Sequence, residues 1–517
     1  MNKQDDTKHY LKLLVKTSFF AFLTILLSKS LSYGYKIVIA RGFGAEIYGL
    51  FSLAVIIAGI FTTASALGFS DGLIRYIPFY RGSKNLAKAK YIVKKAIIIS
   101  IISSVLLYSI LFLLSDQLAT YVFKEPSLAY YLKIIGLSIP FIVVSSIFLS
   151  IIRSFERVTL YSFLSNAFQN GTKLLILLLF ILIGFKNESL VYSYLLTFVF
   201  LALASYFFSR KERYLLQSQK DISKKEKRET YREFLSYSWP FIFTGLIYSI
   251  FYSTDSLILG YFTNAENVGF YNAAVTIVTL FFIAPDLFMQ LFLPLISSKL
   301  SQNKKTLIKD LTKQVSKWIY LINLPLFALI LLFPGVIINI LFGAKFLIAE
   351  NTLRILVIGA LFSGFLSLLT GLISMRGESK TILKGFLIFT VLNAILNLIL
   401  VPRYGLEGAA TATTIVWILF SITLLIQVRN RFKFTPFKPA LIKITLITLL
   451  PVIVLSIVKE FIVINFLTLI ITGIIFGLIY IFLIIITGCL DKNDLMIVNA
   501  VRSKLATQVL KFKSSEQ

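Results

Sequence analysis

The chain has 517 residues, of which 57% are hydrophobic and 15% charged, and its mean hydropathy is +0.85. This composition excludes a water-soluble protein, because apolar runs of about 20 residues recur from end to end. The chain has one cysteine, Cys489, and one histidine, His9, which excludes an internal disulfide and a CxxC metal site, and we expect no cofactor.

The first apolar stretch follows a basic N-terminus with Lys3, Lys8 and Lys12, and it lacks a small-residue cleavage site, so we predict an uncleaved first span. Continuing along the chain, the apolar runs predict an all-α integral membrane protein with about 14 transmembrane helices. The expected spans are residues 17–39, 47–68, 92–114, 128–151, 163–184, 190–208, 236–260, 268–294, 316–341, 353–374, 382–401, 408–428, 440–458 and 463–488.

The net charge of +28 is best explained by membrane topology. With the N-terminus in the cytoplasm, most Lys and Arg residues fall in cytoplasmic loops, so the positive-inside rule predicts that both termini are cytoplasmic. The excess charge also attracts anionic lipid headgroups, and nucleic-acid binding is not needed to explain it. We expect a multi-pass protein of the cell (plasma) membrane.

An internal repeat equates residues 36–54 with residues 256–274, at an offset of 220. Ala45, Glu46 and Gly49 then match Ala265, Glu266 and Gly269. Each repeat holds six spans, an even number, so the two repeats are parallel and related by an axis along the membrane normal. The predicted organisation is a six-helix lobe (1–208), a basic cytoplasmic linker (209–235), a second six-helix lobe (236–430), and two additional helices with a tail (431–517).

Two expected spans carry polar stripes at the spacing of one helix face. A charge at mid-membrane is costly, so such residues usually face a cavity or a partner. The lysines could instead snorkel to the interface, most easily Lys36, or pair with a buried acid. The stripes predict a cationic cavity wall, and the candidate substrate-binding residues are Lys29, Tyr33, Lys36, Asn166, Gln169, Asn170 and Lys173.

Other polar residues are candidates for gating or ion coupling. Asp71 and Arg75 are i, i+4 neighbours that can pair locally, and either a cytoplasmic gate or simple interfacial pairing would explain them. Asp255, toward the outer side of the seventh expected span, is an ion site, a gating residue, or the partner of a lysine in the other lobe. The repeat adds Asp286 and Gln290 as the counterparts of Asp71 and Arg75.

The chain resembles the oligosaccharide flippases of the MATE-like superfamily, also called Wzx-type polysaccharide transporters. The resemblance rests on ARGFGAEIYGLFSLA (40–54), LFGAKFLIAENTLRILVIGA (341–360) with MRGESK (375–380), and YGLEGAATATTIVW (404–417), and it covers residues 10–490. It implies two six-helix lobes, two extra C-terminal helices, and transport of a polyprenyl-linked oligosaccharide from the inner to the outer leaflet by alternating access. Basic cavity residues would then hold the substrate's phosphate or acidic sugars.

The resemblance also implies partners, namely the lipid-linked oligosaccharide, membrane lipids, glycosyltransferases or a polymerase of the same pathway, and a coupling ion such as Na⁺ or H⁺. A MATE-type multidrug exporter and a lipid II exporter have the same architecture and are the alternatives. A membrane-embedded glycan polymerase or glycosyltransferase is disfavoured, because the external loops are short and the sequence has no DxD motif. We therefore expect a transporter and not an enzyme.

Overall fold

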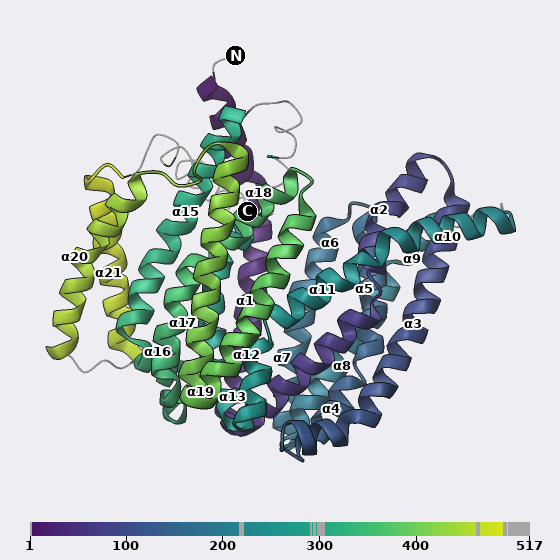
Figure 1. The fold of residues 1–517 in the computed structure, drawn as a ribbon, viewed down its shortest axis with the longest axis horizontal. Helices are drawn as coiled ribbons and strands as arrows, with labels where there is room; N and C mark the ends of the chain where they lie inside the picture. Colours follow the sequence, from purple (N-terminus) through teal and green to yellow (C-terminus); the bar gives the residue numbers. More distant parts are fainter. Residues whose placement is uncertain are drawn as a thin grey trace, which may run out of the picture. The chain divides into compact units, whose positions relative to one another are not determined.

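A computed structural model describes residues 3–216, 222–289, 292, 296, 305–461, 466–489 and 494 (Figure 1). Apart from short turns, these residues form helices, and no strand occurs among them. The described chain divides into two compact units. Unit I comprises residues 24–273 and 386–412, and unit II comprises residues 1–23, 274–385 and 413–517.

The helices that begin before residue 274 belong mainly to unit I. The first, α1 (Lys3–Ser65), bends at Gly44, whose φ of 85° is a left-handed conformation that favours glycine. The others are α2 (Phe69–Gly82), α3 (Leu86–Gln117), η1 (Leu118–Val122), α4 (Leu128–Gly136), α5 (Ile139–Ser154), α6 (Val158–Ser162), η2 (Phe163–Phe168), α7 (Gln169–Ile183), α8 (Glu188–Phe208), α9 (Arg210–Leu215), α10 (Lys224–Ser238), α11 (Pro240–Phe251), α12 (Thr254–Phe262) and α13 (Ala265–Val278).

Unit II holds most of the remaining helices. They are η3 (Thr279–Phe282), α15 (Lys305–Leu332), α16 (Pro334–Phe342), η4 (Ala344–Ala349), α17 (Glu350–Ser363), α18 (Leu366–Met375), α19 (Ser379–Phe432), α20 (Ala440–Phe461) and α21 (Phe466–Ile486). The long α19 bends at Gly405, which also has a positive φ, of 52°. Residues 386–412 of α19 group with unit I, so this helix contributes to both units.

Twelve helices among the described residues are long and apolar enough to cross a membrane. Two of them, Leu26–Ser65 and Ser379–Phe432, each cover two expected spans and bend at a glycine between them. The other ten each correspond to one expected span. The all-α membrane fold is therefore confirmed, whereas the count of 14 separate spans and the division into lobes stay predictions.

The seventh expected span, residues 236–260, is interrupted. Helix α10 ends at Ser238, α11 begins at Pro240, and a second break at Tyr252 and Ser253 separates α11 from α12. At this break the Thr254 hydroxyl donates to the Ile250 carbonyl oxygen at 2.6 Å. Such back-bonding bends helices, and hydropathy alone does not reveal it.

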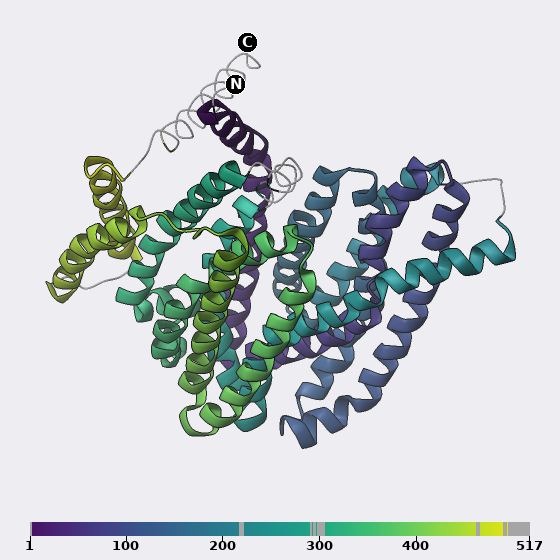
Figure 2. The same ribbon diagram turned by 45° about the horizontal axis from the view of Figure 1, so that its top comes forward.

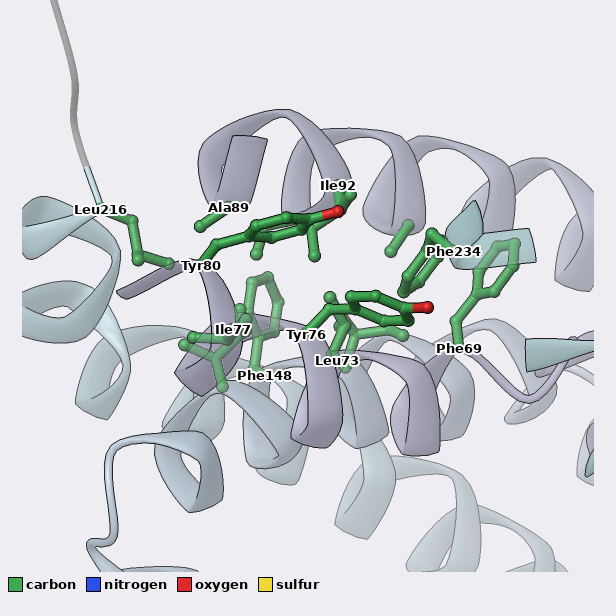
Figure 3. Close-up of a cluster of buried hydrophobic side chains, with 14 residues drawn as sticks. Phe69, Leu73, Tyr76, Ile77, Tyr80, Ala89, Ile92, Phe148, Leu216 and Phe234 are labelled. Atoms are coloured by element: carbon green, nitrogen blue, oxygen red, sulfur yellow. The ribbon is translucent and has the colours of Figure 1, made fainter. Parts of the chain in front are cut away.

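A core of aromatic and aliphatic side chains joins α2, α3, α5 and α10 within unit I (Figure 3). Phe234 of α10 is fully buried and lies 5.2 Å from the ring of Phe69 and 6.1 Å from that of Tyr76, measured between centroids. Helix α10 begins with a capping box between Ser223 and Glu226. The predicted linker 209–235 therefore contains a helix that packs on the transmembrane region.

Each unit has an ion pair at the end of its helices. In unit I Arg157 pairs with the buried Glu212 at 2.6 Å, and in unit II Arg431 pairs with Glu378 at 2.7 Å. The first pair places the base before α6 and the acid in α9, whereas the second places the acid before α19 and the base at its end. The base comes before the acid in the sequence of the first ion pair, and the acid comes before the base in the second.

Helices α20 and α21, the predicted C-terminal pair, pack on each other and on α15 within unit II (Figures 1 and 2). In the middle of α15, the Lys317 ammonium group and the Trp318 indole both donate to Asp494, the latter at 2.7 Å. Lys317 and Asp494 are buried, so the two charges compensate each other. The pair therefore fixes Asp494 to α15.

Candidate substrate-binding site

Helices α1 and α7 lie side by side in unit I and bring the two predicted polar stripes together. A Cβ atom on Gly34 would lie 3.5 Å from the Leu174 side chain, an ordinary van der Waals contact. The Asn170 side-chain amide donates to the Ser28 hydroxyl at 2.9 Å, from α7 to α1. The spacing of small residues thus lets these helices approach closely enough to share one polar surface.

The three lysines of this surface form one positively charged region. Lys29 and Lys36 are close enough for their charges to repel, and so are Lys36 and Lys173. All three side chains are partly exposed. Like charges in a medium of low dielectric constant favour an anionic ligand that neutralises them. We name this region the lysine wall.

Lys173 lies among three aromatic rings. Its Nζ atom is 5.5 Å from the ring centroid of Tyr35, 5.0 Å from that of Tyr194 and 5.5 Å from that of Phe198. Cation–π attraction becomes stronger when the cation is removed from water. These rings therefore stabilise an ammonium group deep in the helix bundle and leave its hydrogen-bond donors available for a ligand.

The other predicted wall residues are partly exposed, but they are placed differently. Asn166 lies in η2, a π-helical turn, and its amide donates to the Ser162 carbonyl oxygen at 3.1 Å. Gln169 begins α7, and Tyr33 lies on α1 between Lys29 and Lys36. A π-helical turn changes the angular position of Asn166 relative to Lys173, so the spacing expected for an α-helix does not hold across this stretch.

Sequence reasoning missed the aromatic residues around Lys173. Tyr35 is buried, and its hydroxyl lies 3.4 Å from the Ser193 hydroxyl on α8. Tyr194 and Phe198 also belong to α8, where their i, i+4 spacing on one face was the available signal. That spacing is equally typical of ordinary core packing, so it pointed to no site.

Asp255 is buried near the start of α12, where it accepts a hydrogen bond from the Tyr271 hydroxyl of α13. The neighbouring pair is similar, since the Asn272 amide donates to the Ser256 hydroxyl at 3.2 Å. Both pairs join α12 to α13 within unit I. The role of Asp255 in gating or ion coupling stays a prediction.

The predicted local pairing of Asp71 with Arg75 is wrong. The Arg75 guanidinium lies over the ring of Tyr237, 4.2 Å from its centroid, and the charge acting on Asp71 is that of Arg153. An exposed i, i+4 ion pair is weak, so stacking on an aromatic ring competes with it successfully. Asp286 is partly buried in unit II, and Gln290 lies outside the described residues.

The residues that the sequence repeat equates meet at a close helix crossing inside unit I. A Cβ atom on Gly49 would lie 1.7 Å from the Ala265 carbonyl oxygen, and one on Gly269 would lie 1.9 Å from the Ala45 carbonyl oxygen. The contact is reciprocal, because each glycine meets the alanine of the other repeat. Only residues without a Cβ atom permit this approach.

A bundle of long apolar helices, two of them bent at glycines, with lysines inside two of its spans, is typical of a polytopic membrane transporter fold. No group of three or more His, Cys, Asp or Glu side chains that could hold a metal ion occurs within the described ranges.

The family model described as "Polysaccharide biosynthesis protein" matches residues 14–298, more than half of the chain, and the chain belongs to this family. The MatE model matches residues 240–399. The resemblance to the oligosaccharide flippases of the MATE-like superfamily, which the sequence motifs indicated, is therefore confirmed.

The chain is also similar to individual proteins. The chain is 26% identical over 420 residues to the "Uncharacterized membrane protein MJ1068" of Methanocaldococcus jannaschii, covering 77% of this chain and 81% of the relative. It is 30% identical over 198 residues to the "Probable low-salt glycan biosynthesis flippase Agl15" of Haloferax volcanii, covering 37% of this chain and 41% of that protein. Among solved structures, the fold is similar to the lipid II flippase MurJ in its inward closed conformation, with a TM-score of 0.70 and 18% identity, covering 89% of this chain and 98% of that one.

Proposed function

We propose that this protein is a flippase that moves a polyprenyl-(pyro)phosphate-linked oligosaccharide from the inner to the outer leaflet by alternating access. The observation that supports this function best is the lysine wall, which places Lys29, Lys36 and Lys173 on two adjacent helices. A relative named as a glycan biosynthesis flippase supports the substrate class.

The lysine wall fits the charged part of such a substrate. A phosphate or pyrophosphate has several acceptor oxygens and a negative charge, and lysine ammonium groups bind it as point charges with three donors each. Lys29 and Lys36 contact the phosphate in this proposal. Lys173, which the rings of Tyr35, Tyr194 and Phe198 hold in place, extends the positive surface further along α7.

The membrane potential favours this direction of transport. Moving one charge across 100 mV corresponds to about 2.3 kcal/mol, so two negative charges moving outward across an inside-negative membrane gain roughly 4 to 5 kcal/mol. The lysine wall lowers the cost of carrying these charges through the low-dielectric interior. A coupling ion such as Na⁺ or H⁺ would add a further driving force, with Asp255, Asp71, Arg75, Asp286 and Gln290 as the candidate coupling or gating residues.

The proposal includes the surroundings of the protein. It lies in the plasma membrane with both termini in the cytoplasm, where membrane glycosyltransferases supply the lipid-linked glycan and a polymerase or transferase on the outer side consumes it. Most of the chain's Lys and Arg residues then face the cytoplasm, as the positive-inside rule requires. The chemistry of transport needs no bond to be made or broken, so we propose a transporter and not an enzyme.

The test is the leaflet accessibility of a lipid-linked oligosaccharide in proteoliposomes, followed with a membrane-impermeant glycan reagent. We expect the Lys29→Ala/Lys173→Ala variant to lose at least about ten-fold in flipping rate, because one lost charge contact of about 1.4 kcal/mol corresponds to a factor of ten. The matched control is Lys124→Ala/Lys186→Ala, which removes two exposed loop charges. Flipping that is equal in all three proteins would refute the lysine wall and retain the flippase.

The match of the MatE model to residues 240–399 supports one alternative, a multidrug exporter. The same proteoliposomes separate the two functions when a cationic dye and lipid II are included as cargo. Transport of the dye without movement of either lipid-linked cargo would replace the flippase with the drug exporter. Movement of lipid II alone would identify a lipid II exporter.

A further inference from the structure

A set of lysines near the start of α3 lies on a helix face that is open to the membrane. Lys90, Lys94 and Lys95 are all exposed. The segment from Arg81 to Lys95 contains six cationic side chains and no acidic one. Its like charges at positions 90 and 94 are i, i+4 neighbours, which repel each other.

The length of α3 places these lysines at a definite depth. Residues 96–115, between Lys95 and Asp116, contain no charged side chain. At about 1.5 Å per residue this stretch is roughly 30 Å long, which matches the hydrocarbon thickness of a bilayer. Lys94 and Lys95 therefore stand at the boundary of the hydrocarbon, and Lys90 lies about 7 Å beyond Lys95, within the headgroup layer.

The face below these lysines is apolar and exposed. Ile98 and Ile101 follow Lys94 at i+4 and i+7, and Ile102 follows Lys95 at i+7. These isoleucines therefore lie on the same helix face as the two lysines. The exposed fractions of these three isoleucines are 41%, 42% and 62%. Lipid acyl chains are the material that covers such a stripe in a membrane. The lysines at its top then face the headgroups of the same lipids.

The opposite face of α3 is fixed by the core of unit I (Figure 3). Ala89, Ile92 and Ala96 of α3 are fully buried in the cluster that contains Phe234 of α10. Glu226, in the first turn of α10, lies close enough to α3 to interact with the charge of Lys88. Glu226 thus interacts with Lys88 on one side of α3, and Lys94 and Lys95 make the exposed side positively charged.

We propose that Lys90, Lys94 and Lys95 form a binding site for the phosphate headgroups of anionic bilayer lipids, and we name it the α3 headgroup site. The alignment of three cations at headgroup depth above an apolar lipid-facing stripe carries the inference. A soluble acidic protein would reach Lys90 but would compete with lipid at Lys94 and Lys95. The occupant is therefore an anionic phospholipid of the monolayer that contains the start of α3.

A local fluorescence measurement on the full-length protein tests this site. In a Cys489→Ser background, Ile102→Cys carries an environment-sensitive dye on the exposed stripe. The protein is placed in nanodiscs of phosphatidylcholine with a minor fraction of phosphatidylglycerol, in which either lipid carries brominated, quenching acyl chains. We expect brominated phosphatidylglycerol to show about a five-fold higher relative association at this dye, the factor that corresponds to one lysine contact with an anionic surface.

The variant Lys94→Gln/Lys95→Gln should remove this preference, and high salt should weaken it in the unchanged protein. Lys124→Gln/Lys186→Gln, which removes two exposed charges from other loops, should retain it. Equal association of both lipids in the unchanged protein, or a preference that persists without Lys94 and Lys95, would overturn the proposal. Binding of a soluble acidic partner that needs these lysines, with no lipid preference, would overturn it too. The readout involves no transport, so its failure leaves the proposed flippase function untouched.

Discussion

The two sequence repeats share a close glycine crossing and carry different chemistry at matching positions. The constant offset between the repeats equates Tyr35 with Asp255 and Lys36 with Ser256. In the first repeat these positions supply an aromatic ring and a cation of the lysine wall. In the second, Asp255 accepts a hydrogen bond from Tyr271, the counterpart of Phe51. One half is therefore cationic and aromatic, and the other carries a carboxylate held by a phenol.

We predict from this difference that the two halves have different tasks. The reciprocal crossing of Gly49 and Gly269 fixes one backbone contact, whereas the side chains beside it differ between the repeats. The cationic half suits an anionic ligand, and the carboxylate of the other half suits a cation or a proton. Substitutions at matching positions should thus have unequal effects.

The largest expected effect on the free energy of unfolding is at the helix crossing of Gly49 and Gly269, which both repeats form. Gly49→Val places a side chain on the Ala265 carbonyl oxygen and should lower the free energy of unfolding by about 3 kcal/mol. Gly59→Val is the matched control, since no atom lies within 4 Å of a Cβ atom there. The buried Cys489, the only cysteine, reports thermal unfolding through a thiol-reactive dye. Equal unfolding temperatures of the two variants would show that the crossing is not tight.

A smaller effect should distinguish the two halves. Tyr271→Phe removes the donor to a buried carboxylate and should cost about 1 to 3 kcal/mol, with coupling to Asp255→Asn of similar size. The corresponding test in the first repeat is Tyr35→Phe, which removes a longer hydrogen bond between two neutral hydroxyl groups and should cost less than about 1 kcal/mol. Unfolding in bicelles measures both. Strictly additive effects of the Tyr271 and Asp255 changes would contradict a specific pair.

The smallest expected effect on the free energy of unfolding concerns the two ion pairs, Arg157–Glu212 and Arg431–Glu378. Arg157→Gln leaves the buried Glu212 carboxylate without its ion partner, and because Arg157 is itself half exposed we expect a cost of only about 1 to 2 kcal/mol. Arg431→Gln leaves Glu378 paired with Arg376 at 3.1 Å and should cost less than about 0.5 kcal/mol. Adding Glu212→Gln to Arg157→Gln should restore most of the loss. An equal cost for both arginines would mean that burial of Glu212 is unimportant.

Hydropathy and the repeat predicted the helical fold well, because bilayer thickness sets the length of every apolar run. Hydropathy and the repeat did not predict features that depend on side-chain geometry. At the break after Phe251 the Thr254 hydroxyl donates back to the preceding helix, and the position of Arg75 depends on Tyr237, which is distant in the sequence. Hydropathy weighs neither effect.

The sequence also predicted only part of the candidate site, because part of that site depends on side-chain geometry. Lys29, Lys36 and Lys173 stand out because a charge within an apolar run is rare. The rings of Tyr194 and Phe198 do not, because aromatic residues are common in membrane helices and only the tertiary packing of α8 against α7 brings them to Lys173. Recognition of cations in a sequence is thus easier than recognition of what stabilises them.

The reciprocal crossing of Ala45 and Gly49 with Ala265 and Gly269 has the form of an isologous dimer interface, in which the same patch on two subunits meets itself. If a single repeat associated with a second copy of itself, this one patch on each copy would be enough to form the contact. Within one polypeptide, two copies of a repeat need not be identical, because each can carry its own side chains. In this chain the repeats do differ at matching positions, where Tyr35 corresponds to Asp255 and Lys36 to Ser256.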